Sequence, residues 1–195
     1  MNRLYFDTET TGVIPKSETR LEHMPRIVQV AALLCNDDMD EVMHFNAIIK
    51  PEGFTIPSGA SAIHGITTEF ADRVGLPLLT VMAFLSSLAT KADVIVAHNL
   101  AYDYPVFCGE IMRINRPNRM ENKKRFCTML GAMPIVKKPS RYPSVSQPYG
   151  WPSLMESHEF LIGSKFSGAH DALADVRACQ RIHQELIILG AANDT

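Results

Sequence analysis

The sequence predicts an α/β domain built around a mixed β-sheet, and two features of the chain predict it. Strand-like apolar runs come first, and later strand-like runs alternate with helix-like ones, an order typical of a sheet flanked by helices. The length of 195 residues suits a single domain. We therefore expect residues 1–195 to form one such domain.

The N-terminal part of the chain predicts a meander of three strands. Its apolar and β-branched runs place these strands at residues 3–6, 25–36 and 41–51. Residues 13–25 combine prolines with charges and predict a loop. Residues 53–70 predict a loop with short helical turns.

The second part of the chain alternates between helices and strands. Helices are expected at residues 77–90, 103–114, 151–161 and 170–189, and strands at residues 93–97 and 124–129. Residues 134–150 contain four prolines and predict a long loop, which in a compact domain is either functional or mobile. Trp151, which follows this loop, is expected to belong to the core, and the alternative is a stacking platform for bases.

The composition is ordinary for a soluble globular protein, with 46% hydrophobic and 21% charged residues. No apolar run approaches the ~20 residues that span a bilayer, and no secretory leader is recognisable. The four cysteines lack the spacing of a metal site, which favours free thiols in a reducing compartment. We therefore expect a cytoplasmic protein without membrane association.

The net charge of −2 hides a basic segment. Between Arg113 and Arg141 nine lysines and arginines stand against one acid, Glu121. Such a segment can follow a phosphate backbone, and we expect Lys123, Lys124 and Arg125 to contribute. The alternative is a solvated helix end followed by a loop.

Two carboxylates, Asp7 and Glu9, come at the end of the first apolar run. Alternate residues of a strand point to the same face, so these side chains project together and repel each other. A divalent cation between them would relieve the repulsion, and oxygen ligands favour Mg²⁺ or Mn²⁺. The alternative is a solvent-exposed strand end that needs no ligand.

Two later segments supply further candidate residues. Asp103 follows a buried strand and stands near a helix start, where it is either a site residue or an N-cap. Asp175 shares a helix face with Asp171 and needs a cationic partner if buried. His170 is either a base beside that partner or a capping histidine. Two metal ions about 4 Å apart need roughly four carboxylates, the number that Asp7, Glu9, Asp103 and Asp175 supply.

The stretches FDTETTG, HNLAYD and HDALAD resemble, in this order, the three exonuclease motifs of the DEDDh family. That family includes the proofreading epsilon subunit of bacterial DNA polymerase and ribonuclease T. PRIVQVAALL and IPSGASAIHGIT are also similar to family segments, whereas residues 134–150 have no counterpart in it. The resemblance implies a ribonuclease H-like fold: a five-stranded mixed sheet with the second strand antiparallel, flanked by helices.

The resemblance also implies a metal-dependent 3′–5′ exonuclease that uses two Mg²⁺ or Mn²⁺ ions and a histidine base. Its product would be nucleoside monophosphates, and DNA is favoured over RNA as the substrate. The implied metal ligands are Asp7, Glu9, Asp103 and Asp175, and the implied base is His170, whose ordinary pKa near 6.5 suits this role. The implied contacts with the terminal nucleotide are Thr11, Gly12, His64, Asn99 and Tyr102.

Several alternatives stay open. His64 is also explained as a loop histidine that stabilises a turn, and Asn99 as a residue that holds its loop. A ribonuclease T-like RNA exonuclease is the main functional alternative. A haloacid-dehalogenase-like phosphatase is less well supported because its second acid is Asp, whereas this chain has Glu9. A non-catalytic nucleic-acid-binding module would leave the acids unexplained. The expected partner is a nucleic acid with a free, single-stranded 3′ end, and the sequence does not decide between polymerase association and a homodimer.

Overall fold

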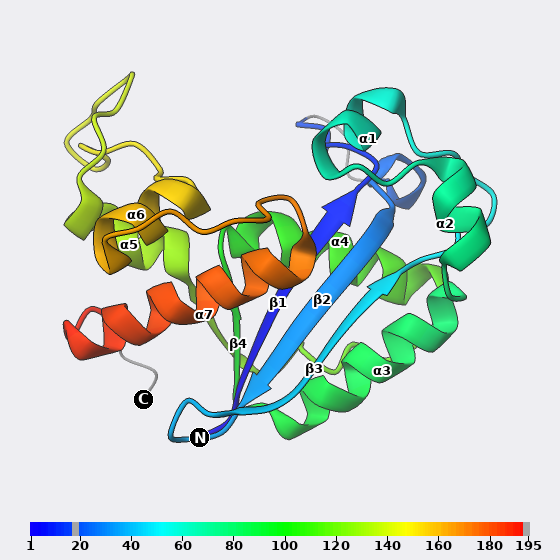
Figure 1. The fold of residues 1–195 in the computed structure, drawn as a ribbon, viewed down its shortest axis with the longest axis horizontal. Coiled ribbons are helices and arrows are strands. Elements are labelled where there is room, and N and C mark those ends of the chain that lie inside the picture. Colours follow the sequence, from blue (N-terminus) through cyan, green and yellow to red (C-terminus); the bar gives the residue numbers. More distant parts are fainter. Residues whose placement is uncertain (17–19, 193–195) are drawn as a thin grey trace.

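The computed structural model describes residues 1–16 and 20–192 and has a five-stranded sheet at its centre (Figure 1). The strand order is β3-β2-β1-β4-β5. β2 runs antiparallel to both β1 and β3, whereas β4 is parallel to β1 and β5 to β4. The mixed sheet with an antiparallel second strand is therefore confirmed. The strands are β1 (Arg3–Thr10), β2 (Ile27–Cys35), β3 (Glu41–Ile48), β4 (Val94–Ala97) and β5 (Lys124–Cys127).

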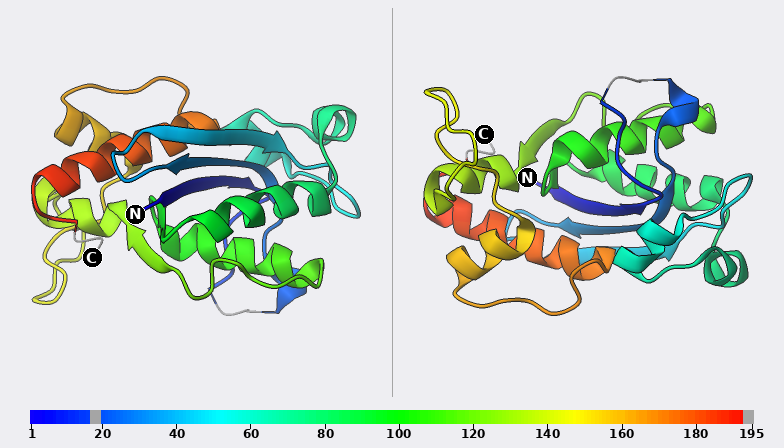
Figure 2. Two further views of the ribbon diagram at one scale, coloured as in Figure 1. Left: turned by 90° about the horizontal axis from the view of Figure 1, so that it is seen from below. Right: turned by 90° about the horizontal axis from the view of Figure 1, so that it is seen from above.

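Helices cover both faces of the sheet (Figure 2). α3 (Leu78–Lys91) and α4 (Leu100–Arg113) lie on one face, where the side chains of Leu4 and Phe6 join their core. α7 (Ala172–Ile188) lies on the other face, against the buried Tyr5. Because side chains alternate along a strand, β1 supplies apolar residues to both layers, which explains its central position.

The shorter helices lie around this core. α1 (Ser58–His64) and α2 (Thr68–Val74) stand near the end of β1, and α5 (Thr128–Val136) and α6 (Leu154–Ile162) pack beside α7 (Figure 1). A short 3₁₀ helix spans Leu21–His23. Within the described part of the chain, no helix combines the length and apolar character needed to cross a membrane.

Several predicted boundaries are wrong. β1 continues four residues further than expected, to Thr10, because β2 pairs with it along its whole length. α4 begins at Leu100, three residues before the predicted start. α5 extends to Val136, so it takes the first residues of the predicted loop. Ser153 caps α6 with its side chain, so this helix begins at Leu154 and excludes Trp151. Trp151 is 58% exposed, and its assignment to the core is wrong.

Candidate active site

The end of β1 presents Asp7 and Glu9 beyond the reach of the neighbouring strand β4. The side chains alternate, so both carboxylates follow Tyr5 on the α7 face. β2 continues beside them, with Ala31 opposite Asp7 and Gln29 opposite Glu9, whereas the pairing with β4 ends at Tyr5. The carboxylates therefore lie beyond the end of β4, beside the start of α4.

Asp103 reaches the site from the first turn of α4. Its Oδ1 atom accepts hydrogen bonds from the Thr8 backbone N–H at 3.1 Å and from the Thr8 hydroxyl at 2.7 Å. The N-cap position of α4 is taken by Asn99, so the alternative that made Asp103 a helix cap is wrong. Burial raises the pKa of Asp103 to about 7, although the hydrogen bonds from Thr8 oppose this rise.

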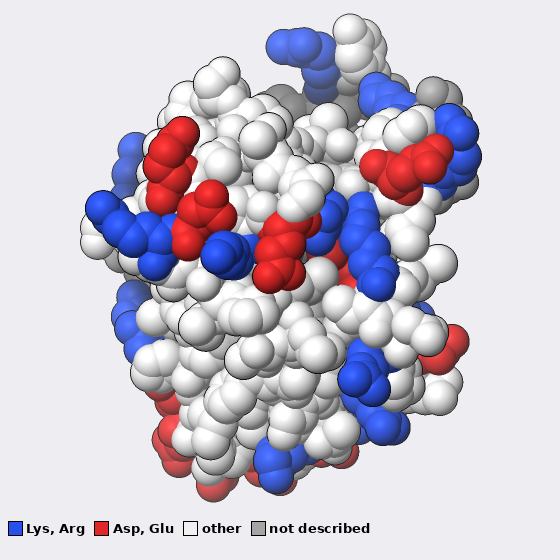
Figure 3. Space-filling view, turned by 90° about the vertical axis from the view of Figure 1, so that its right-hand side faces the viewer, with Lys and Arg blue, Asp and Glu red and all other residues white. Residues whose placement is uncertain are grey.

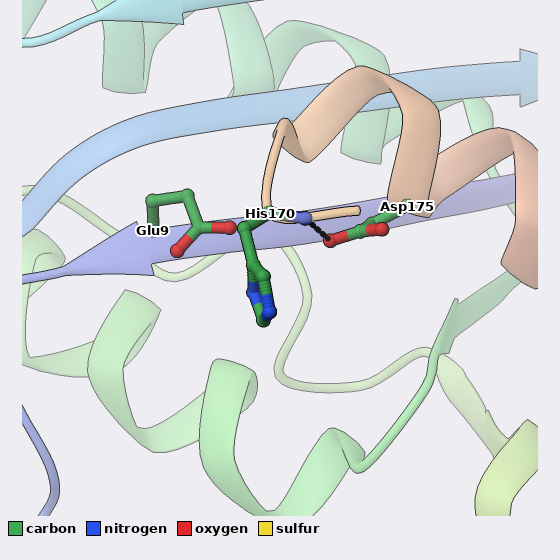
Figure 4. A group of neighbouring side chains, drawn as sticks. All are labelled: Glu9, His170 and Asp175. Carbon is green, nitrogen blue, oxygen red and sulfur yellow. Dashed lines mark hydrogen bonds between the residues drawn. The ribbon is translucent and has the colours of Figure 1, made fainter. Parts of the chain in front are cut away.

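Asp175 reaches the same site from the first turn of α7. Its Oδ2 atom accepts a hydrogen bond from the His170 backbone N–H at 3.0 Å, whereas its Oδ1 atom is buried without a hydrogen-bond partner. Potential ligand atoms of Glu9, His170 and Asp175 all lie within 4.8 Å of one another (Figure 4). Asp171 is the N-cap of α7 and accepts from the N–H groups of Leu173 and Ala174, so its role is accounted for locally.

His170 occupies the tight turn that leads into α7. Its φ of 68° places it in the left-handed region, which histidine tolerates better than most residues. This conformation turns its N–H toward Asp175 and leaves its ring exposed, between the carboxylates of Glu9 and Asp175 in Figure 4. The backbone N–H of His170 therefore holds Asp175, whereas its ring stays accessible to solvent.

The carboxylates interact strongly with one another. Burial raises the pKa of Asp7 well above its usual value, and the charges of Asp103, Asp175 and Glu9 raise it further. Burial and the charge of Asp175 raise the pKa of Glu9 to about 8. Burial raises that of Asp175 to about 6. Packed carboxylates with raised pKa values and an unpartnered oxygen fit a divalent cation, since hard cations prefer oxygen ligands.

Thr11, Gly12 and Tyr102 belong to a hydrogen-bonded turn after β1. The Thr11 N–H donates to the Arg26 carbonyl at 2.9 Å, and the Thr11 hydroxyl accepts from the Arg26 N–H at 2.9 Å. The Thr11 N–H thus already has a partner within the fold, and contact of Thr11 and Gly12 with a terminal nucleotide stays a prediction. The Tyr102 hydroxyl contacts Thr10 Oγ1 and donates to the Gly12 carbonyl, so it fixes the shape of this turn.

His64 and Asn99 each lie at the end of a helix. His64 ends α1, where its Nδ1 atom accepts from the Ile66 N–H at 3.1 Å, as expected of a turn-stabilising histidine. Burial lowers the pKa of His64, the Thr10 carbonyl opposes this shift, and the charge of His170 reinforces it. Asn99 is exposed, has a φ of 66° and does not cap α4 with its side chain.

Two residues of the site region have roles that the sequence motifs did not predict. Thr8 anchors Asp103, as described above, although motif spacing marks only the acids on either side of it. His98 is a neutral bridge, because burial lowers its pKa to about 4. Its Nδ1 atom lies 3.0 Å from the Thr128 hydroxyl, and its Nε2 atom 3.1 Å from the Pro152 carbonyl. The sequence signal that could have predicted this role is the position of His98 directly after a buried strand.

Three residues of the predicted basic segment have partners within the fold. Arg113 lies 3.4 Å from the buried Glu110 and donates to two backbone carbonyls. Lys123 donates to the Ala92 carbonyl at 2.7 Å, and Lys138 pairs with Glu156 at 2.8 Å. On the face that includes α2, acidic and basic side chains are interspersed (Figure 3). Lys124 and Arg125 are exposed and remain candidates for contact with phosphate.

Comparisons with known proteins identify the family of this chain. A family model described as an exonuclease (RNase_T) matches residues 4–182. DNA polymerase III subunit epsilon of Buchnera aphidicola subsp. Acyrthosiphon pisum (strain APS) is 29% identical over 143 residues, 71% of this chain and 56% of the relative. The same subunit of Buchnera aphidicola subsp. Schizaphis graminum (strain Sg) is 27% identical, and the match covers 69% of this chain and 55% of that relative. The chain thus spans about half the length of these relatives.

Solved structures share the fold. Escherichia coli exonuclease I in a zinc-bound complex with single-stranded DNA superposes with a TM-score of 0.71 at 22% identity. The match covers 97% of this chain and 40% of that one. The same enzyme in complex with a dT13 oligonucleotide also gives 0.71 at 22% identity, over 95% and 40% of the two chains. These likenesses confirm the ribonuclease H-like fold.

Proposed function

Because this chain belongs to the exonuclease family, with a model that matches residues 4–182, we propose that it releases nucleoside monophosphates from the 3′ ends of nucleic acids. The observation that supports this most is the convergence of acids from three distant segments. Asp7 and Glu9 on β1, Asp103 on α4 and Asp175 on α7 meet at the end of one strand, and His170 stands beside them. No structural role in the core requires such a cluster of like charges.

Single-stranded DNA is the favoured substrate in this proposal. Exonuclease I is bound to single-stranded DNA in the structures that resemble this chain, and the curated relatives are subunits of a DNA polymerase. RNA is the alternative substrate, since discrimination depends on a contact with the 2′-hydroxyl group. A polymerase partner is an alternative to independent action, as the relatives are polymerase subunits.

Different residues of the site are proposed to bind the metal ions, accept a proton and hold the terminal nucleotide. Asp7, Glu9, Asp103 and Asp175 would hold two Mg²⁺ or Mn²⁺ ions, which when bound lower the pKa of a water molecule and stabilise charge on the leaving 3′ oxygen. His170 accepts the proton of the attacking water at its exposed ring, while its backbone N–H keeps Asp175 in place. Thr8 holds Asp103 in position. Tyr102 fixes the turn at Gly12 against which the terminal nucleotide would bind.

Degradation of a 5′-labelled single-stranded oligonucleotide in Mg²⁺ tests the proposal. A ladder that shortens from the 3′ end is expected for the native protein, and Asp7→Asn should abolish it. His170→Gln should lower kcat by about 10²–10⁴, the usual contribution of a general base, while Mg²⁺ still raises the melting temperature. Asp38→Asn, at an exposed acid in the β2–β3 turn, is the matched control.

Undiminished degradation by Asp7→Asn would refute the metal assignment. Release of the 5′ label as a mononucleotide without a ladder of intermediates would refute the polarity. Parallel digestions of single-stranded DNA, of duplex DNA with a mismatched 3′ end and of RNA decide the substrate. We expect single-stranded DNA to be degraded fastest. Faster degradation of RNA would favour the ribonuclease T-like alternative.

A further inference from the structure

A groove with a volume of about 660 Å³ opens at the carboxyl ends of β4 and β5, next to the catalytic cluster. Its volume lies within the range of about 300–1,000 Å³ that is typical of small-molecule sites. In α/β sheets ligands commonly bind outside the carboxyl ends of strands. The groove is lined by residues that include Asn99, Ala101, Tyr104, Arg125, Leu130 and Trp151.

The lining of this groove combines flat rings with one cation. The Arg125 guanidinium lies over the Tyr104 ring, 4.5 Å from the ring centroid and within the ~6 Å of a cation–π contact. Trp151 is 58% exposed and Leu130 is 51% exposed, so a large apolar surface faces solvent. Aromatic faces beside an arginine are the elements with which proteins bind single-stranded nucleic acids without reading their sequence.

The position of Trp151 is fixed by its neighbours in the chain. The adjacent Pro152 carbonyl lies 3.1 Å from His98 Nε2, which ties it to the end of β4. On the other side, the Gly150 N–H donates to the Lys138 carbonyl at 2.9 Å. Ser153 then caps α6 through a reciprocal pair of hydrogen bonds with Glu156. The indole is thus exposed on a tethered segment, which lowers the entropy cost of stacking against it.

The groove is continuous with the catalytic cluster through the first turn of α4. Asn99 and Ala101 line the groove, and the next residues, Tyr102 and Asp103, belong to the active site. The N-terminal end of this 14-residue helix therefore stands between the two, and its dipole favours a negative group there. A strand whose 3′ nucleotide is at the carboxylates can pass a phosphate across this end and place its next bases in the groove.

We propose that this groove binds nucleobases on the 5′ side of the scissile phosphate. Trp151 and Tyr104 are the surfaces on which the bases stack, and Arg125 contacts a phosphate of the nucleic-acid backbone. The inference rests on the proposed exonuclease function and adds to it a second binding site on the same strand. It also assigns a role to Trp151, which follows a segment without a counterpart in the family motifs.

Fluorescence tests the contact directly, because Trp151 is the only tryptophan of the chain. Octathymidylate is titrated into the Asp7→Asn variant, in which hydrolysis is blocked and one repelling charge is removed. Stacking of a base should quench the Trp151 emission in parallel with the anisotropy change of a labelled copy of the oligonucleotide. Thymidine 5′-monophosphate, which occupies only the terminal site, should leave the emission unchanged.

Kinetics on two substrates separate the groove from the catalytic cluster. Trp151→Ala should lower kcat/KM for octathymidylate about tenfold through KM, equivalent to about 1.4 kcal/mol and within the ~1–3 kcal/mol of base stacking. Turnover of the p-nitrophenyl ester of thymidine 5′-monophosphate should stay unchanged, because it has no base on the 5′ side. Trp151→Phe should restore most of the loss. Phe160→Ala, at a ring that is 57% exposed on α6, is the matched control.

The outcomes distinguish the two proposals. Octathymidylate that binds by anisotropy without quenching Trp151, or an unchanged KM in Trp151→Ala, overturns the groove assignment and leaves the exonuclease function standing. Absence of hydrolysis of both substrates by the native protein refutes the function, whereas quenching by octathymidylate still supports the groove. Arg125→Gln should reduce the slope of log affinity against log salt by about one, and an unchanged slope counts against its contact with the backbone.

Discussion

Substitution of Asp175 by Asn is expected to stabilise the metal-free protein at alkaline pH, although it removes a predicted metal ligand. The Asp175 and Glu9 ligand atoms lie within 4.8 Å of each other, and both side chains are shielded from water to different degrees. Asn keeps an oxygen that can accept the His170 N–H, so this hydrogen bond survives. The substitution therefore removes both the cost of burying the Asp175 charge and its repulsion of Glu9.

The magnitude follows from two independent estimates. Two unit charges 4.8 Å apart at an effective dielectric constant of about 20 repel by about 3.5 kcal/mol. The second estimate concerns burial: the rise in the pKa of Asp175 from 3.8 to about 6, caused mainly by burial of the carboxyl group, corresponds to about 3 kcal/mol. Glu9 is partly exposed, so solvent screening reduces the expected gain to about 1–2 kcal/mol. For a chain of this size the melting temperature should rise by about 2–8 °C.

The sign of the effect depends on pH. A carboxyl group whose pKa is raised in the folded state contributes stability that is fully present below its unfolded pKa. That contribution is lost as the pH rises through about 6 for Asp175 and about 8 for Glu9. The metal-free native protein should therefore become less stable between pH 4 and pH 9. The difference between native protein and Asp175→Asn should be largest at pH 9 and small at pH 4.

Thermal denaturation in EDTA at both pH values measures this difference, and Mg²⁺ is then added in excess. The native protein should gain stability from Mg²⁺ at pH 9, whereas Asp175→Asn should gain little. Asp38→Asn serves as the control for the loss of an exposed negative charge. A lower melting temperature of Asp175→Asn than of the native protein in EDTA at pH 9 would refute the repulsive cluster.

Two further substitutions test the surroundings of the site. Thr8→Val removes the hydroxyl that donates to Asp103 at 2.7 Å, and a hydrogen bond to a charged group is worth about 1.5–3 kcal/mol. The pKa of Asp103 should rise further, so the acidic limb of the pH–rate profile should move to higher pH; an unmoved limb contradicts the assigned role of Thr8. Glu110 is fully buried and accepts from Arg26 Nε and the Ile27 N–H, both at 2.9 Å. Glu110→Gln should leave the Arg26 charge uncompensated and lower the free energy of unfolding, measured by urea denaturation, by about 3–5 kcal/mol. A decrease below about 1 kcal/mol would contradict this.

The sequence predicted the convergence of acids well, because two simple periodicities govern it. Alternation along β1 places Asp7 and Glu9 on one face, and a position in the first turn of α7 places Asp175 toward the same end of the sheet. The start of α4 was harder to predict. We expected it at residue 103, yet the helix begins three residues earlier and contains Pro105 in its interior. Tertiary packing of Leu100 against the core outweighs the local preference.

The surroundings of the acids depend on contacts that no local pattern encodes. Thr8 points away from Asp7 and Glu9, and it becomes a partner of Asp103 only because α4 packs against that face of β1. Trp151 was expected in the core since large aromatic residues usually bury much of their surface. Whether it does so depends on the neighbours that the tethered segment brings near it, and these leave its indole largely uncovered.

The stability lost at the cluster of carboxylates is offset along the same strand. At its carboxyl end β1 holds Asp7 and Glu9 in surroundings that penalise their charge. At its other end Leu4 and Tyr5 are fully buried between two helical layers, and β2 pairs with the strand from Arg3 to Thr10. One rigid strand can therefore keep repelling groups in place before any cation neutralises them. A less well anchored strand would relax and separate the carboxylates, and it would then have to be reordered each time that metal and substrate bind.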